Sequence, residues 1–156
     1  MERKVEVDAL DLDAARSGPD SGFFGPAVPI DVPRAWAVAW RSDGKRVAFV
    51  RSVRRDNTDA DLILADKDGN LLWRTTVSSD GAYVGEPQWT PDGRWIFVPT
   101  FPRGGRRIIA VEAGTGRAFD LSQYRWDAYF SLSPSGHELL LSNGRGGYWK
   151  ATLDFE

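Results

Sequence analysis

Arginine recurs in three polar segments of the sequence whose composition is otherwise typical of loops. The arginines that we select as candidate ligand-binding residues are Arg54, Arg55, Arg103, Arg106 and Arg145. A guanidinium group binds a carboxylate or phosphate through two parallel hydrogen bonds, which suits arginine to oxyanions. A fold that gathers these segments would therefore present a surface for an anionic ligand.

Aromatic residues occupy further connecting segments and complement the arginines. The rings that we add to the candidate ligand-binding residues are Tyr83, Tyr124 and Trp126. Rings beside guanidinium groups supply stacking area for a peptide or a small acidic molecule. In the competing interpretation the arginines are solvated and pair with Asp56, Asp59 or Asp61, while the rings fill interfaces between structural elements.

Patterns for catalysis or metal binding are scarce. His137 is the one histidine of the sequence and cysteine is absent, so we expect neither a zinc site nor a cysteine nucleophile. The segment 66–70 (Asp-Lys-Asp-Gly-Asn) partly matches a calcium loop but lacks the terminal glutamate of that pattern. We interpret it as a hairpin turn, and we expect no catalytic residue, no metal and no cofactor.

The charge and hydropathy of the whole chain argue against several kinds of partner. The 156 residues include 20 Lys and Arg and 22 Asp and Glu, which gives a formal net charge of −2. This near balance predicts no nucleic acid partner and no attraction to an anionic membrane. The N-terminal residues lack the apolar stretch of a secretory signal, and no run approaches a membrane span. We expect a cytoplasmic protein, and a periplasmic or extracellular one if a signal peptide was removed.

A phrase that occurs three times organises most of the sequence. Its copies lie at residues 38–50, 87–98 and 130–141. Their turn glycines, 49 and then 43 residues apart, are Gly44, Gly93 and Gly136. Each copy consists of an apolar strand, a turn of the Pro-Asp-Gly kind and a second apolar strand. This period matches one four-stranded blade of a β-propeller.

We therefore predict an all-β fold made of three four-stranded antiparallel blades, which is half of a β-propeller. The blades are expected at about 35–78, 83–122 and 127–156 within a domain at 35–156. The third blade has little chain left for its outermost strand. Residues 4–10 show the alternation of an edge strand, and residues 1–12 are predicted to close this last blade, either in their own chain or in a partner. Residues 13–34 are rich in proline and glycine and predict an irregular arm.

The order of strands in a blade predicts where the candidate residues gather. Connections from the second to the third strand, and from one blade to the next, leave at one end of the sheets, and the short hairpin turns leave at the other. The longer connections at 51–59, 100–107 and 142–148 share the first end. We expect the selected arginines and rings to lie there.

The phrase at residues 89–98, Trp-Thr-Pro-Asp-Gly-Arg-Trp-Ile-Phe-Val, resembles the TolB-like (WD-repeat-like) β-propeller repeat, and the resemblance extends over residues 36–153. The first copy departs from the repeat at Ser42, where proline is usual. The third has Leu132 and Ser135 in place of the tryptophan and the aspartate. The resemblance implies a propeller fold. Members of the family serve as interaction scaffolds, accessory domains of peptidases and, in some branches, lyases, and the structural phrase selects none of these roles.

Three blades do not close a ring, since propellers contain four to eight. Exposed apolar sheets would lose many kcal/mol, at roughly 25 cal/mol for each Å² left in water. We expect a homodimer in which two half-rings form one six-bladed propeller. The alternative is that the sequence is part of a longer propeller. Trp40, Trp89 and Trp149 are expected to face neighbouring blades.

The residues predict a non-enzymatic binding or scaffold module that recognises an anionic peptide or a small acidic ligand at the end bearing the arginines. A purely structural, self-assembling protein without a ligand is the first alternative. A propeller lyase or a hydrolase accessory domain is the second. The lyase requires a metal or an acid–base cluster that the sequence does not show.

Overall fold

The computed structural model describes residues 32, 34–53, 59–79, 81–102, 105–121, 130–142 and 146–154. The chain divides into the units Met1–Ile30 and Asp31–Glu156, and the described residues all belong to the second unit. The edge strand expected at 1–12 and nearly all of the arm expected at 13–34 lie outside them. In the part of the chain that is described, no helix has the length and apolar character to cross a membrane.

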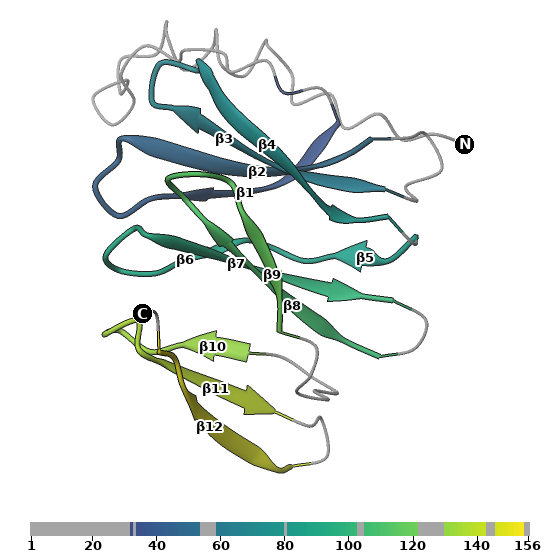
Figure 1. The fold of residues 1–156 in the computed structure, drawn as a ribbon, viewed down its shortest axis with the longest axis vertical. Helices are drawn as coiled ribbons and strands as arrows, with labels where there is room; N and C mark the ends of the chain where they lie inside the picture. Colours follow the sequence, from purple (N-terminus) through teal and green to yellow (C-terminus); the bar gives the residue numbers. More distant parts are fainter. Residues whose placement is uncertain are drawn as a thin grey trace, which may run out of the picture. The chain divides into compact units, whose positions relative to one another are not determined.

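The first sheet contains four antiparallel strands in sequence order (Figure 1). They are β1 (Ala35–Trp40), β2 (Arg46–Ser52), β3 (Ala60–Asp66) and β4 (Leu71–Ser78). Alternation of apolar side chains and the two tight hairpin turns explain this arrangement. The turn glycines Gly44 and Gly69 have φ values of 66° and 89°, a region that side chains with a Cβ rarely enter.

The second sheet begins with a strand that is interrupted into two short pieces, β5 (Tyr83–Val84) and β6 (Gln88–Trp89). The other strands of this sheet are β7 (Trp95–Phe101), β8 (Arg107–Glu112) and β9 (Ala118–Asp120). Both β5 and β6 pair with β7. Between them Gly85 packs so closely on Pro99 that an added Cβ would lie 2.6 Å from the Pro99 ring. Glycine is therefore required at the interruption.

The third sheet has three described strands. They are β10 (Phe130–Leu132), β11 (Glu138–Ser142) and β12 (Tyr148–Thr152), paired in that order. On its outward face Lys150 Nζ lies 2.8 Å from Glu138 Oε1, beside the exposed Leu140.

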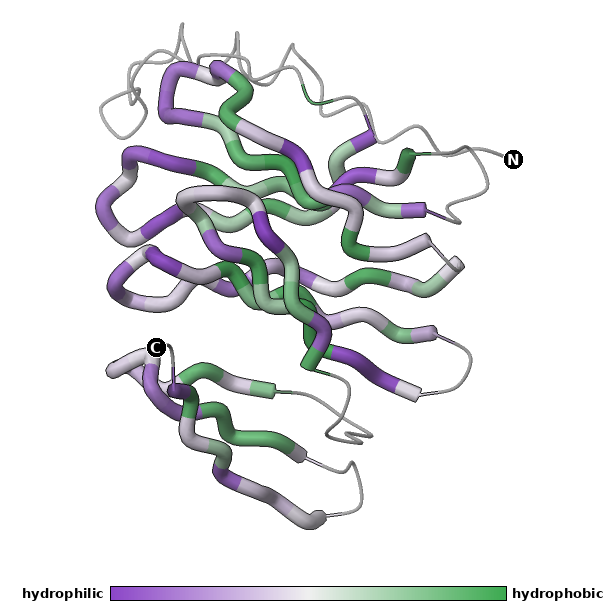
Figure 2. Tube along the Cα trace, viewed as in Figure 1, coloured by the Kyte–Doolittle hydropathy of each residue, from purple (hydrophilic) through white to green (hydrophobic). Residues whose placement is uncertain are grey.

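The second sheet is apolar on both faces, and this property builds the core. Neighbouring side chains along a strand point to opposite faces, so Ile96 and Val98 pack towards the first sheet and Phe97 towards the third. The first core includes Leu62, Leu64, Ile96, Val98 and Val111. The second core is formed by Phe97, Ile108, Ala110, Leu139 and Leu141. The apolar colouring of the central strands in Figure 2 follows this pattern.

Hydrogen bonds from tryptophan side chains join the first and second sheets in addition to the apolar packing. Trp89 Nε1 donates to the carbonyl of Ala39 at 3.0 Å, and Trp73 Nε1 donates to the carbonyl of Ala113 at 3.0 Å. Trp89 thus faces the neighbouring sheet, as expected. Trp40 does not, because its side chain lies on the face of the first sheet away from the second, and it is 54% exposed. Trp149 of β12 is 49% exposed, but it pairs with Leu141 and so lies on the face of the third sheet that packs on the second.

The core assignment gives a direct test with two leucines of the first sheet. Leu62 is fully buried, whereas Leu72 is 46% exposed. We expect Leu62→Ala to lower the free energy of unfolding by about 2–5 kcal/mol through lost burial and a cavity. Leu72→Ala should change it by less than about 0.5 kcal/mol. Urea denaturation followed by tryptophan fluorescence measures both values, and equal losses would contradict the core described above.

Candidate functional site

The sequential antiparallel order of the strands sorts the connections into two groups (Figure 1). The connections β2–β3, β7–β8 and β11–β12, together with the link from β4 to β5, leave at what we call the loop end. The hairpins β1–β2, β3–β4, β6–β7, β8–β9 and β10–β11 leave at the turn end. Arg106, which precedes β8, therefore lies at the loop end.

Two of the candidate residues selected from the sequence are described. Tyr83 lies in β5 at the loop end, and Arg106 directly precedes β8. The other six candidates lie outside the described residues: Arg54, Arg55, Arg103, Arg145, Tyr124 and Trp126.

Tyr83 and Arg106 are joined by two further aromatic residues into one row. The ring centroids of Trp36 and Tyr83 are 5.3 Å apart, and those of Tyr83 and Phe101 are 5.6 Å apart. Arg106 Cζ lies 5.0 Å from the centroid of the Phe101 ring, in the range of a cation–π contact. We call these four residues the aromatic–arginine cluster. Trp36 is 41% exposed and Tyr83 65%, so the row presents ring surface to solvent.

Backbone geometry explains how the row forms across two sheets. The register of β1 against β2 shifts between Ala35 and Ala37, and such a bulge re-aims the side chain at its centre, here Trp36. Tyr83 and Phe101 are direct cross-strand partners of β5 and β7, a position in which aromatic rings interact. The sequence gives no measure of this register, so residue types and spacing do not indicate Trp36 and Phe101 as site residues.

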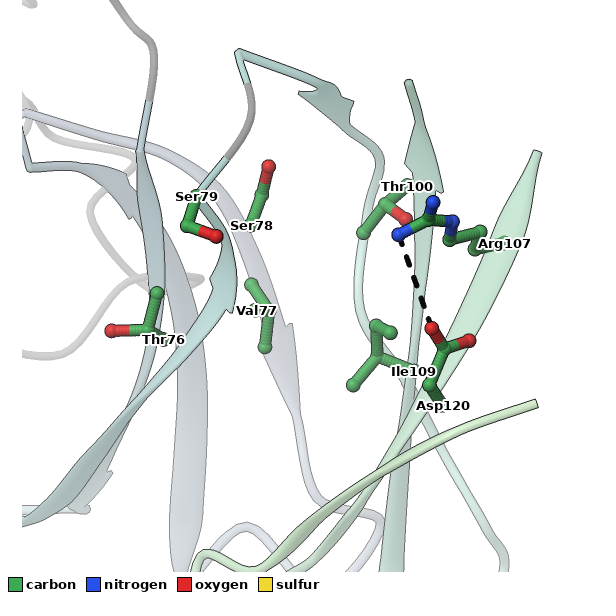
Figure 3. A pocket seen from close by; sticks show the side chains of 8 residues that line it. All are labelled: Thr76, Val77, Ser78, Ser79, Thr100, Arg107, Ile109 and Asp120. Atoms are coloured by element: carbon green, nitrogen blue, oxygen red, sulfur yellow. Dashed lines mark ion pairs between the residues drawn. The ribbon is translucent and has the colours of Figure 1, made fainter. Parts of the chain in front are cut away.

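A polar cleft opens between the first and second sheets at the same end (Figure 3). We call it the inter-sheet cleft. Its volume is about 170 Å³. It is lined by Thr76, Val77, Ser78, Ser79, Thr100, Arg107, Ile109 and Asp120. None of these residues was selected from the sequence, because single hydroxyls and one ion pair gather here only when two sheets meet.

A neighbouring pocket of about 260 Å³ surrounds a buried carboxylate of the first sheet. It is lined by Val53, Asp59, Asp61, Arg74, Thr76 and Ser79, so Thr76 and Ser79 border both cavities. Asp61 is buried, lies 3.5 Å from Arg51 Nη2 and accepts a 2.9 Å hydrogen bond from Thr76 Oγ1. A buried charge requires such partners, and this arrangement gives Asp61 a structural role.

The turn at 66–70 is stabilised by its own hydrogen bonds. Asp66 Oδ1 accepts from the amides of Asp68 and Asn70 at 2.9 and 2.8 Å, and Oδ2 accepts from Asn70 Nδ2 at 2.8 Å. The side-chain hydrogen bond from Asn70 is the largest cause that holds the pKa of Asp66 below its ordinary value. Across the described part of the chain, no three His, Cys, Asp or Glu side chains are placed to hold a metal ion. The hairpin interpretation accounts for this segment.

Replacing Asn70 tests that account. Because the folded-state pKa of Asp66 lies below its unfolded value, the ionised carboxylate stabilises the fold at higher pH, and this contribution is lost as the pH falls through the folded-state pKa. We expect Asn70→Ala to raise the pKa of Asp66 and to weaken the loss of stability on acidification. An NMR pH titration of the Asp66 carboxyl measures the shift, and the Asp92 carboxyl of the second sheet, which should not move, is the control.

Comparison with known proteins rests on solved structures. No protein-family model matches the sequence, and no curated protein does. The β-propeller domain of Cps50 (Swd1) from Myceliophteria thermophila aligns with a TM-score of 0.54 at 14% identity over 80% of this chain and 39% of that structure. TolB from Acinetobacter baumannii aligns with a TM-score of 0.51 at 22% identity over 76% of this chain and 29% of that structure. This chain has a β-propeller fold.

These likenesses bear on architecture alone. The chain spans well under half the length of either structure. The predicted all-β class and propeller architecture are confirmed by the sheets and by both neighbours. The number of blades in a closed ring, closure by a second copy and the TolB-like assignment stay predictions.

Proposed function

We propose that this propeller chain is a non-enzymatic binding or scaffold module whose loop end recognises an anionic peptide or a small acidic ligand. The observation that carries the proposal is the aromatic–arginine cluster, in which Arg106 stacks on Phe101 beside the exposed rings of Tyr83 and Trp36. Ring surface costs free energy while it faces water, and a bound ligand removes that cost.

The chemistry of the row fits an acidic ligand that also carries apolar groups. A guanidinium packed over an aromatic ring uses its flat face for that contact. Its N–H groups lie in the plane of the guanidinium and can still bind a carboxylate. Arg54, Arg55, Arg103 and Arg145 lie outside the described residues, and the sequence predicts them at the same end. Their positive charge would attract anions to the cluster and raise the association rate.

We also propose that the repeat is TolB-like in kind. Its support is the sequence phrase together with the turn of the second sheet, where the amide of Arg94 and the hydroxyl of Thr90 donate to Asp92 Oδ1. Gly93 follows with φ of 67°. This is the role that the aspartate and glycine of the phrase predict.

Arg106→Ala tests the binding proposal. The probe is a dye-labelled decapeptide of alternating glutamate and valine, and its affinity is measured by fluorescence anisotropy. Loss of a charge-assisted hydrogen bond should weaken binding by about tenfold or more. Rising salt should weaken binding to the unmodified chain as well.

Arg117→Ala is the matched control. Arg117 Cζ also lies over a ring, 5.3 Å from the centroid of Phe119, but it follows the β8–β9 hairpin at the turn end. Its removal should leave the affinity unchanged. Equal losses for both variants, or binding that ignores salt, would contradict a site at the loop end. No binding by a chain that still self-associates would favour the structural alternative.

For the assembly, we propose that a second copy covers the outer face of the first sheet and that two half-rings close one six-bladed propeller. Val38 and Trp40 of β1 are exposed on this face, whereas Val47 and Phe49 of β2 and Ile63 of β3, which share it, are buried. In the second sheet the residue equivalent to Trp40 is Trp89, which packs against the preceding sheet and donates to Ala39. If Trp40 packs as Trp89 does, a further sheet has to lie against its side of the first sheet. In a closed ring, the third sheet of a partner would occupy that position.

The stacking of the turns supports the same direction. A Cβ at Gly93 would collide with Arg41 of the preceding sheet, and one at Gly136 would lie 2.7 Å from Pro91 Cδ of the preceding sheet. The equivalent Gly44 of the first sheet has nothing within 4 Å. At this turn and at Trp40 the first sheet lacks the neighbour that the second and third sheets have.

Light scattering on the purified chain tests the closure. We expect a dimer, and we expect both Trp40→Gln and Leu140→Gln to yield monomers, since a ring joins the first sheet of one copy to the third sheet of the other. Phe119→Gln, which removes an exposed ring from the second sheet, should remain dimeric. A dimer lost only in Trp40→Gln would show pairing of first sheets and overturn the ring, as would a monomeric wild-type chain.

A further inference from the structure

The inter-sheet cleft has a positive and a negative group side by side on one wall. Arg107 Nη1 lies 4.0 Å from Asp120 Oδ2, and the two side chains are 46% and 43% exposed. Figure 3 shows both on the second-sheet side of the cleft, joined by the dashed line of the ion pair. An ion pair of this length in solvent is weak. Charged groups of a ligand can therefore compete with this contact.

Hydroxyl groups surround these charges. Thr100 of β7 and Ser78 of β4 are buried at the cleft, and Ser79 lies on the opposite wall. Thr76 also lines the cleft, but its hydroxyl donates to Asp61. Each hydroxyl both donates and accepts hydrogen bonds. The site can therefore bind charged oxygen and nitrogen atoms alike.

The inner part of the cleft is apolar and small. Val77 of the first sheet and Ile109 of the second approach each other there (Figure 3), and both belong to the core between the two sheets. At ~30 Å³ for each water, the cleft of about 170 Å³ holds roughly five or six waters. A ligand of similar volume has a handful of non-hydrogen atoms.

We propose that the inter-sheet cleft is a second binding site, which takes a small zwitterion of the α-amino acid class. The ligand carboxylate binds Arg107, its ammonium group binds Asp120, and a short aliphatic side chain contacts Val77 and Ile109. A lone anion would meet the Asp120 carboxylate and a lone cation the Arg107 guanidinium. Only a ligand with both charges matches the whole wall. This site is separate from the aromatic–arginine cluster and does not depend on it.

Isothermal titration calorimetry with L-valine on the full chain tests the proposal. We expect saturable binding within the solubility of valine. Isobutylamine and isovalerate keep the branched apolar part but lack one charge, and each should bind at least about tenfold more weakly, since each loses a charge-assisted contact. Equal binding of isovalerate would make the cleft an anion site, and binding of glucose in place of valine would make it a site for neutral polyols. Either result overturns the proposal.

Substitutions that remove a charge and keep a similar side-chain shape test whether the calorimetric signal comes from valine bound in the inter-sheet cleft. Arg107→Gln and Asp120→Asn should each lower the affinity for valine by about tenfold or more, while circular dichroism shows that both variants remain folded. Lys150→Gln breaks another exposed ion pair, with Glu138, on the third sheet, and should leave the affinity unchanged. Arg106→Ala should also leave it unchanged, which separates this site from the one proposed for acidic peptides. Absence of valine binding to the wild-type chain, or equal loss in Lys150→Gln, overturns the assignment.

Discussion

The two-sided apolar character of the second sheet is the constraint on which the rest of the molecule depends. Because Ile96 and Val98 point one way and Phe97 the other, β7 has no side to leave in water. A sheet of this kind requires a neighbour on each face, and the first and third sheets supply them. The indole of Trp89 then sets the direction of stacking through its hydrogen bond to Ala39, since a buried N–H needs an acceptor.

This stacking also brings the polar chemistry together. Sheets that pack face to face align their connections, so side chains from separate repeats meet at the loop end. Trp36 and Tyr83 come from different sheets and form one aromatic row. The walls of the inter-sheet cleft also come from different sheets, with Thr76 and Ser78 on one and Arg107 and Asp120 on the other. Neither site exists within a single repeat.

The sequence predicts local features of this fold well because they depend on short spacings. The glycine period gives the repeat, and the Pro-Asp-Gly phrase gives a turn in which Gly93 has positive φ. The sequence indicates Tyr83 and Arg106 as candidate binding residues because an arginine or an aromatic ring in a connecting segment is recognisable from residue type alone. Trp36 depends on a bulge in β1, and the cleft depends on how two sheets meet. Such tertiary geometry is determined by packing, and no pattern along the chain encodes it directly.

The shared wall of the two cavities has a thermodynamic consequence. Thr76 and Ser79 border both the inter-sheet cleft and the pocket around Asp61, and the hydroxyl of Thr76 is already engaged by that carboxylate. If molecules occupied both cavities and one of them drew Thr76 away from Asp61, the two binding events would be linked. Linkage is reciprocal, so each occupant would then change the affinity for the other by the same factor.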